Sequence, residues 1–458
     1  MNKNKAAVAG KSRDGFTSSF GVLAATLGSA VGLGNIWKFP YLTGTNGGAG
    51  FLIVYVLATL VVGLPVMIAE IMLGRKAKAD AFTTLKTLAP AGQPWWVISV
   101  MGVAAAFLIM AFYSEVAAWV FAYVFKAMGS SIVTHDPKVT SAAFGQLISD
   151  PLQSLLWQWL VLALIAGILL MGVAKGIEAV AKKLMPLLFL LLLVVGARSL
   201  MLPGASAGVG FLFHPDFSKI SAGVVLTAVG LAFFKLSIGM GTMMTYGSYF
   251  RDDQNIPATT LRVMCADLFV SMLAGLAIFP AVFAFGFEPA AGPSLLFITI
   301  PAVFASMPLG HLFMVVFFFL TAISAVGAML SLLEVPVSVI SGRFHMSRVK
   351  ATILTLLLLL VVGSGCALSN SSMAGFKVFG MTLFDLFDFC TSNVLLPLGG
   401  ILLCIFTGWV WGLDRTRLAL SNQGALNNQG LCRLLVFLLR YVSPLLILVV
   451  MLKGLKVF

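Results

Sequence analysis

The sequence predicts an all-α membrane protein with about eleven transmembrane helices, because it holds that many apolar runs of the roughly 20 residues that a hydrocarbon core requires. Of its 458 residues, 60% are hydrophobic and 10% are charged, and the mean hydropathy is +1.04. Soluble domains carry about 25% charged residues. The composition therefore indicates a polytopic protein in contact with a lipid bilayer, with little chain left for a soluble domain.

The predicted spans follow one another along the whole chain. They lie near residues 16–41, 48–73, 97–126, 155–173, 184–202, 221–247, 258–286, 309–340, 351–368, 380–411 and 433–452. The first run follows a short basic tail, residues 1–15, and carries no small-residue cleavage signal. We therefore interpret it as a retained span and not as a signal peptide.

Lysine and arginine residues set the predicted orientation. They concentrate in alternate loops, beginning with the N-terminal tail, and cytoplasmic loops are the ones that are enriched in these residues. We therefore expect a multi-pass protein of the cell (inner) membrane, with its N-terminus in the cytoplasm and its C-terminus outside. This topology, together with anionic lipid, accounts for the net charge of +13. Nucleic acid is not an expected partner.

Several classes of function lack the residues that they need. The five cysteines stand singly, without the spacing of zinc sites or disulfide frameworks, and the four histidines are scattered. A nucleotide-driven pump would need a P-loop, and the sequence contains none. We expect no enzyme, no organic cofactor and no metal other than sodium.

One charged residue lies in the middle of a predicted span. Lys235 stands within the apolar segment from Gly230 to Gly241. An ionisable side chain at this depth costs at least a few kcal/mol unless it is paired or hydrated, and by default it marks a functional site.

Two spans contain a Gly-x-Gly sequence near their centres, Gly32-Leu-Gly34 in the first and Gly239-Met-Gly241 in the sixth. Glycine disfavours a helix by about 1 kcal/mol relative to alanine. Backbone that opens at bilayer depth must line a cavity or be buried in protein. Close packing of neighbouring helices is the alternative explanation for either motif alone.

The equivalent positions of these two motifs predict inverted five-helix repeats with discontinuous helices 1 and 6 around a midplane site. The repeats would cover residues 16–202 (spans 1–5) and 221–411 (spans 6–10). Residues 412–458 would form a cytoplasmic loop and span 11.

The residues around these motifs resemble the neurotransmitter:sodium symporter family, in particular its eleven-span bacterial amino-acid transporters. The resemblance begins with Ala30-Val-Gly-Leu-Gly-Asn35-Ile-Trp-Lys-Phe-Pro40 and Asn46-Gly-Gly-Ala-Gly50. It continues nearly to the end of the chain, with Gly74-Arg75, Tyr113 with Trp119, Lys175-Gly-Ile-Glu178, Phe213-His-Pro-Asp-Phe217, Tyr246-Gly-Ser-Tyr249 and Leu332-Leu-Glu-Val-Pro336. It implies a secondary transporter that works by alternating access.

The resemblance implies a binding site for a small neutral amino acid. The opened backbone around Ala30, Gly32 and Gly34 would meet the amino and carboxylate groups, with the positive ends of the half-helix dipoles toward the carboxylate. Tyr113 would donate its hydroxyl to that carboxylate, unless it is a core or interfacial tyrosine. The side-chain pocket would be lined by Ile109, Phe234, Ser237, Met240, Ala328 and Leu332, of which Phe234 and Met240 could equally be core residues.

The resemblance also implies two gates. Lys38 would pair with Asp388 at the extracellular gate, although lysine lacks the bidentate fork of the arginine that is usual there. A rim pair that anchors two helix ends is the alternative. Arg13 and Tyr249 would belong to the cytoplasmic gate, where Gly342 takes the place of the acidic partner of Arg13.

The first sodium site of the family is altered. Its matching positions are Ala30, Asn35, Lys235 and Asp267, so an ammonium stands where a threonine would face the cation. We hypothesise that Lys235 replaces this sodium, pairs with Asp267 and meets the substrate carboxylate directly. The ion pair would offset the desolvation of both charges.

The second sodium site lacks its two usual hydroxyls, because these positions are Gly327 and Ala328. Backbone carbonyls around Gly28, Val31 and Ser324 would remain, whereas a hard cation takes several oxygen ligands. If the alignment is shifted by one residue, Ser324 or Ser331 would serve instead.

These differences leave the coupling ion open. Sodium at an altered site, a proton at Lys235 and sodium-independent exchange are the alternatives, since a buried lysine can lose its proton near neutral pH. Chloride dependence and oligomeric state are not predicted.

We expect a secondary active transporter of a small neutral amino acid. A transport-inactive membrane sensor that binds an amino acid is the second hypothesis, favoured by the lost ion ligands. A channel is disfavoured, because the sequence offers no filter-like carbonyls or acidic ring.

Overall fold

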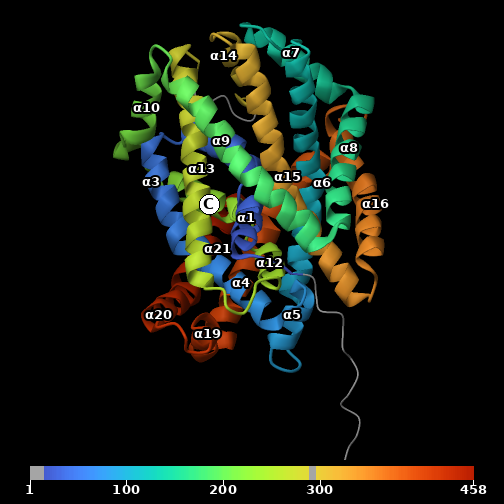
Figure 1. Ribbon diagram of the computed structural model, residues 1–458, viewed down its shortest axis with the longest axis vertical. Helices are drawn as coiled ribbons and strands as arrows, with labels where there is room; N and C mark the ends of the chain where they lie inside the picture. The colour runs from blue at the N-terminus through green and yellow to red at the C-terminus, as the bar shows by residue number, and fades with distance from the viewer. Residues whose placement is uncertain (1–14, 288–294, 458) are drawn as a thin grey trace, which may run out of the picture.

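The computed structural model describes residues 15–287 and 295–457 as a bundle of helices (Figure 1). Within these residues the only β-structure is an isolated bridge between Val378 and Met381. Nine continuous helices there are long and apolar enough to cross a membrane. They are Ala49–Ala77 (α3 to α4), Val97–Met128 (α6), Pro151–Leu170 (α8), Val173–Leu200 (η3 and α9), Ile256–Ala284 (α13), Gly310–Arg343 (α15), Arg348–Asn370 (α16 and η6), Leu383–Leu420 (α17 to α19) and Gln429–Gly454 (α20 to α21).

The first span is interrupted, as predicted. It consists of α1 (Ser19–Ala30), followed by η1 (Gly34–Lys38) and α2 (Phe39–Thr45), and it bends by 52° at the break.

The sixth span is interrupted in the same way, between α11 (Ala222–Lys235) and α12 (Thr242–Gly247). Gly239 and Gly241 adopt positive φ angles of 81° and 74° in the connection, a conformation that glycine takes without a steric penalty. The two broken spans complete the eleven that the sequence predicts.

Equivalent spans of the two predicted repeats pack against each other. The third and eighth spans, α6 and α15, lie along one another, and so do the fourth and ninth, α8 and α16. Such pairing is typical of inverted repeats. The repeat boundaries assigned from the sequence stay a prediction, and most of the tail, residues 1–14, lies outside the described residues.

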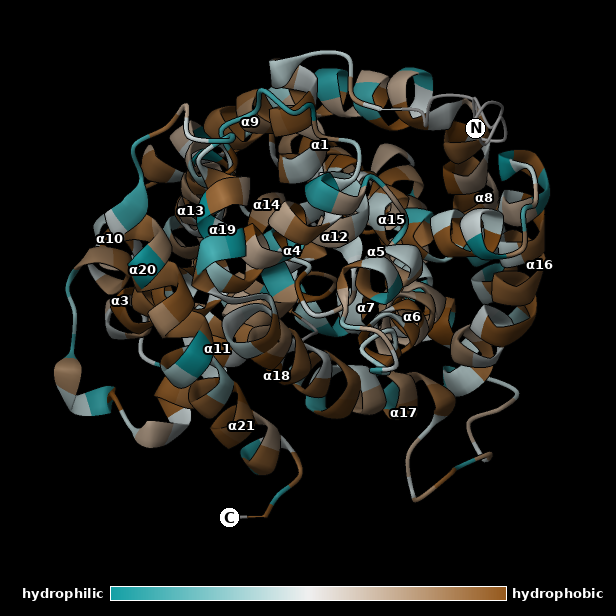
Figure 2. Cartoon of the chain, turned by 90° about the horizontal axis from the view of Figure 1, so that it is seen from below, coloured by the Kyte–Doolittle hydropathy of each residue, from teal (hydrophilic) through white to brown (hydrophobic). Residues whose placement is uncertain are grey.

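Short helices that the sequence analysis did not predict cover the two ends of the bundle. In Figure 1, α7 (Pro137–Ser149) and α14 (Thr299–Ala305) lie at one end and α5 (Ala81–Leu88) at the other, while α10 (Ala205–Phe213) lies along an edge. Figure 2 shows hydrophobic residues on the outer helices as well as in the interior. Outward-facing apolar residues, such as Val361 at 76% exposure, are expected where lipid is the solvent.

Candidate functional site

The two helix breaks face a small cavity at the centre of the bundle. Its free volume is about 30 Å³. It is lined by Ser29, Ala30, Gly32, Gly34, Ile109, Tyr113, Phe234, Lys235, Ser237, Met240, Ala328 and Leu332. The structure therefore places every residue that the resemblance implied for substrate around one cavity, and it adds Ser29, which the sequence analysis did not name.

Glycine, which has no side chain, lets other groups approach the backbone of the opened first span. A Cβ atom on Gly32 would lie 2.8 Å from the Cβ of Ala328 and 2.8 Å from the hydroxyl of Tyr113. The N–H of Leu33 donates to that hydroxyl over 2.8 Å. The hydroxyl hydrogen of Tyr113 is thereby left to donate to an anionic group in the cavity.

The side chain of Lys235, at the end of α11, is fully buried beside α13 and α3. Its Nζ lies 3.0 Å from Oδ2 of Asp267 and 2.9 Å from the hydroxyl of Tyr55, and it also donates to Oγ of Ser271. The rings of Phe39 and Tyr55 lie 5.1 and 5.0 Å from Nζ, within range of a cation–π interaction. An ammonium has three N–H donors, and all three have acceptors here.

This arrangement limits what Lys235 can do for a substrate. The sequence analysis expected its ammonium to meet the substrate carboxylate directly. With its three donors occupied, the ammonium could do so only by releasing one of its present acceptors. Its carbon stem passes Gly34 at the edge of the cavity, where a Cβ on Gly34 would lie 3.3 Å from Cγ of Lys235.

Asn35 links the opened first span to Asp267. Its Oδ1 accepts from the N–H of Gly32 at 3.2 Å, and its Nδ2 donates to Oδ1 of Asp267 at 2.7 Å. This orientation follows from the hydrogen-bond network. A cation bound by Asn35 would need the amide oxygen to face Asp267, so the observed network suits the Lys235 ammonium.

The residues of the predicted second ion site meet where α1 crosses α15. A Cβ atom on Gly327 would lie 2.6 Å from the carbonyl oxygen of Gly28, so the two backbones pack directly on each other. Ala328 faces the central cavity, and Val31 directly follows the last residue of α1. The hydroxyl of Ser324 is buried and has no hydrogen-bond partner among the described residues.

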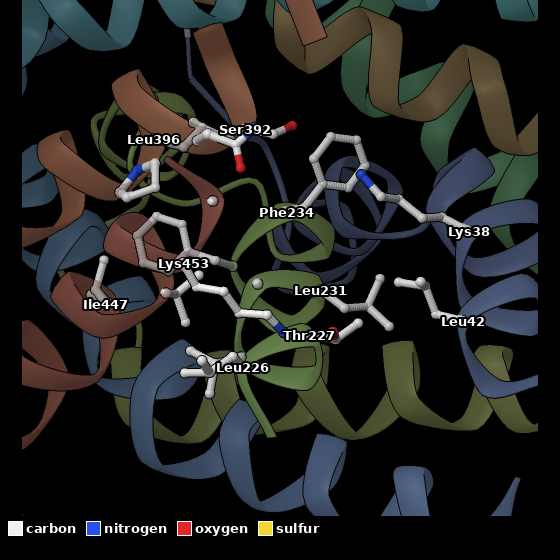
Figure 3. A pocket seen from close by; sticks show the side chains of 17 residues that line it. Lys38, Leu42, Leu226, Thr227, Leu231, Phe234, Ser392, Leu396, Ile447 and Lys453 are labelled. Carbon is white, nitrogen blue, oxygen red and sulfur yellow. The ribbon is translucent and has the colours of Figure 1, made fainter. Parts of the chain in front are cut away.

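The extracellular gate residues lie apart from each other. The ammonium of Lys38 sits 4.0 Å from the ring centroid of Phe234, as Figure 3 shows, and Oδ1 of Asp388 accepts from Ser392 over 2.9 Å. The described residues therefore contain no Lys38–Asp388 ion pair. Phe234 also separates the central cavity from an outer one of about 310 Å³, which lies between α11, α18 and α21.

The cytoplasmic gate is described only in part, because Arg13 lies outside the described residues. The hydroxyl of Tyr249 donates to Oε1 of Glu334 over 2.5 Å, and Arg348 binds both oxygens of this carboxylate over 2.8 and 2.5 Å. The carboxylate of Asp80 lies against Gly342. In the family an acidic side chain would stand at position 342. Here the carboxylate of Asp80, from another part of the chain, lies beside that position.

Comparisons with known proteins agree with this geometry. The family model described as the sodium:neurotransmitter symporter family matches residues 13–140 and 146–458. YhdH of Bacillus subtilis, an uncharacterized sodium-dependent transporter, is 38% identical over 438 residues, covering 96% of this chain and 97% of its own. The human sodium- and chloride-dependent creatine transporter 1 is 27% identical, with 88% of this chain and 71% of its own covered.

A solved structure shows the same architecture. The crystal structure of MhsT in complex with L-phenylalanine matches with a TM-score of 0.88 at 40% sequence identity, covering 96% of this chain and 100% of that one. The proteins of the matching family are transporters and not enzymes. The broken first and sixth spans, the cavity between them and the match along nearly the whole chain show that this protein is a multi-pass secondary transporter that belongs to the sodium:neurotransmitter symporter family.

Proposed function

We propose that the protein transports a small neutral amino acid by alternating access and that Lys235 takes the place of one bound sodium ion. The observation that carries the proposal is the ion pair between Lys235 and Asp267, with 3.0 Å between Nζ and Oδ2 and both side chains fully buried. The tethered ammonium supplies one positive charge beside the cavity without an ion from solution. A buried pair of this kind persists only when its remaining hydrogen bonds are satisfied, as Tyr55, Asn35 and Ser271 satisfy them here.

The cavity suits the two ends of a neutral amino acid. Tyr113 accepts from the N–H of Leu33, and its hydroxyl hydrogen offers a donor for a carboxylate. Ile109, Met240 and Leu332 form an apolar wall, which favours an aliphatic or aromatic side chain. The complex of the 40% identical MhsT with L-phenylalanine supports a substrate of this class.

The proposal limits the role of sodium. Lys235 makes sodium unnecessary at the first site. At the second site, the direct packing of Gly28 on Gly327 excludes a side-chain ligand at position 327, and Ser324 keeps a hydroxyl without a partner in the described structure. We therefore expect sodium to bind weakly there.

We also propose that the protein lies in the cell (inner) membrane, where the basic loops orient its N-terminus toward the cytoplasm.

Uptake of labelled L-phenylalanine into proteoliposomes tests the proposal, with external sodium or choline. The parent should take up or exchange the amino acid equally in both salts, and Lys235→Thr should make the activity depend on sodium. Lys453→Thr is the matched control, since Lys453 donates to the carbonyl of Gly223 away from the cavity. Sodium dependence of the parent that Lys235→Thr leaves unchanged would contradict the role of Lys235. Binding without uptake or exchange would favour the sensor.

A further inference from the structure

Besides Lys235 and Asp267, another buried ionisable side chain lies in the middle of a membrane-spanning helix, two residues beyond Tyr113. Glu115 of α6 is 1% exposed. Its Oε1 accepts from Nε1 of Trp119 over 2.7 Å, while its Oε2 has no hydrogen-bond partner among the described residues. None of the ion pairs in the described part of the chain includes Glu115. Glu115 is not among the site residues predicted from the sequence.

The surroundings of Glu115 suit a neutral carboxylic acid better than a carboxylate. Ser154 of α8 lies next to the carboxyl group, and its hydroxyl hydrogen points to the carbonyl of Leu147 over 3.3 Å. A serine hydroxyl can donate to a carboxylate or accept from a carboxylic acid, so Ser154 can serve either form of Glu115. A carboxylate at bilayer depth without a cation costs several kcal/mol.

No positive charge on the neighbouring elements faces this carboxyl in the described structure. Cys366 of α16 is the titratable group nearby, and α8 presents Ser154 and Gln158. Between His311 and Glu334, α15 carries no charged residue, and neither do η7 (Thr391–Leu395) and α18 (Leu396–Ile405).

The remaining charged groups on α6 and the elements around it lie toward helix ends or have other partners. Lys126 lies in the last turn of α6 and Arg343 in that of α15, while Arg348 and Lys350 lie in the first turn of α16, where Arg348 binds Glu334. Asp385 and Asp388 of α17 accept hydrogen bonds from Thr382 and Ser392. Lys86 lies on α5, at the end of the bundle. Glu115 can therefore change its charge only by gaining or losing a proton.

Aromatic rings cover the face of α6 that carries Glu115. Phe112, Glu115 and Trp119 share one face of α6, because helix positions three and seven apart align. Trp119 stacks on Phe384 of α17 with 6.0 Å between ring centroids and 18° between the planes, and Phe112 meets the same ring at 5.5 Å. The ring of Phe384 therefore closes this face of α6 on the side of α17.

We propose that Glu115 is a proton-binding site through which a proton gradient drives transport. Its carboxylate gains one proton when the cover formed by Phe384 opens, crosses the closed state as a neutral acid and loses that proton on the other side. Only the bond between oxygen and hydrogen forms and breaks. Lys235 is the less suitable carrier, because its three donors are bound and Asp267 stabilises its charge. The inference rests on the proposed transport function.

Glu115→Gln tests the proposal, because glutamine keeps the size of the side chain and an oxygen for Trp119 but cannot titrate. Proteoliposomes would hold the entrapped pH dye pyranine, and L-phenylalanine is the probe. In the parent, adding the amino acid should move protons, and an imposed gradient of one pH unit should raise accumulation up to about tenfold at one proton per substrate.

The variant should exchange L-phenylalanine within about twofold of the parent, with both proton-dependent signals lost. Asp414→Asn, which removes a carboxylate whose side chain is 97% exposed, should behave like the parent.

Three results would overturn the proposal. Glu115→Gln could keep the dye signal and the accumulation. The parent could exchange L-phenylalanine without any proton movement, which would leave the transport function standing and remove the role of Glu115. The parent could also fail to exchange, which would remove both.

If Glu115→Gln does not fold, chemical labelling of the parent protein tests the proposal. Dicyclohexylcarbodiimide attacks protonated carboxyl groups, so peptide mass spectrometry should find Glu115 labelled more at acidic than at alkaline pH. Labelling that does not change with pH, or no labelling at all, would contradict a titrating acid.

Discussion

The carbonyl oxygen of Gly28 packs directly against the backbone of Gly327, where the last turns of α1 cross α15. A Cβ atom at position 327 would lie 2.6 Å from that oxygen and 3.3 Å from the Cα of Gly28. The space that a side-chain ligand and its ion would need is therefore taken by contact between two helix backbones. Small residues at such crossings let helices approach closely in membranes.

Gly327→Ala should destabilise the protein. The new methyl group pushes α15 away from α1, and overpacking of this kind costs about 1–3 kcal/mol. Gly196→Ala in α9 is the matched control, because a Cβ at that helical position meets nothing within 4 Å and alanine favours a helix by about 1 kcal/mol. Thermal unfolding in detergent measures both. If the two variants melt alike, the crossing is looser than the structure shows.

The single variant Asp267→Asn should be less stable than the double variant that carries both Lys235→Thr and Asp267→Asn. The single variant leaves a buried ammonium without its counter-charge, and breaking one side of a buried ion pair costs about 3–5 kcal/mol. The double variant removes both charges and restores an oxygen ligand set for sodium with Asn35. Thermal unfolding should show a higher melting temperature for the double variant than for Asp267→Asn. Added sodium chloride should raise the melting temperature of the double variant only. A double variant as unstable as the single one would contradict this account.

The fold could be predicted from the sequence because its determinants are local. Apolar runs fix the spans, and the glycines of Gly32-Leu-Gly34 and Gly239-Met-Gly241 mark the two breaks. The positive φ angles of Gly239 and Gly241 explain the second break. The short helices α7 and α14 could not be predicted in this way, because they lack a run long enough to span a bilayer.

The lining of the site could be predicted, but its contacts could not. The pairing of Lys235 with Asp267 followed from the resemblance, whereas the ammonium's use of all its donors depends on where Tyr55 and Ser271 lie. These two residues come from different helices. The position of Glu115 in the protein interior is likewise a matter of packing, since a glutamate within an apolar run does not reveal what it faces.

Tyr113→Phe should weaken binding of L-phenylalanine without changing the fold. A hydrogen bond to a charged group contributes about 1.5–3 kcal/mol, which corresponds to roughly a 10- to 150-fold loss of affinity. Tyr123→Phe on the same helix is the control, because its hydroxyl is buried and has no partner in the described structure. Scintillation proximity binding gives both affinities. Equal affinities in the two variants would place the substrate carboxylate away from Tyr113.

Lys38 should act through Phe234 and not through Asp388 in the closed conformation. Its ammonium lies 4.0 Å from the centre of that ring, and a cation–π contact at an exposed site contributes about 0.5–1 kcal/mol. Lys38→Met should therefore raise the rate at which bound L-phenylalanine leaves toward the outer cavity by about two- to fivefold. Asp388→Asn should change it little, and the effects of the two substitutions should add. An interaction energy between the two substitutions in a double-mutant cycle would instead show that the pair closes the gate during dissociation.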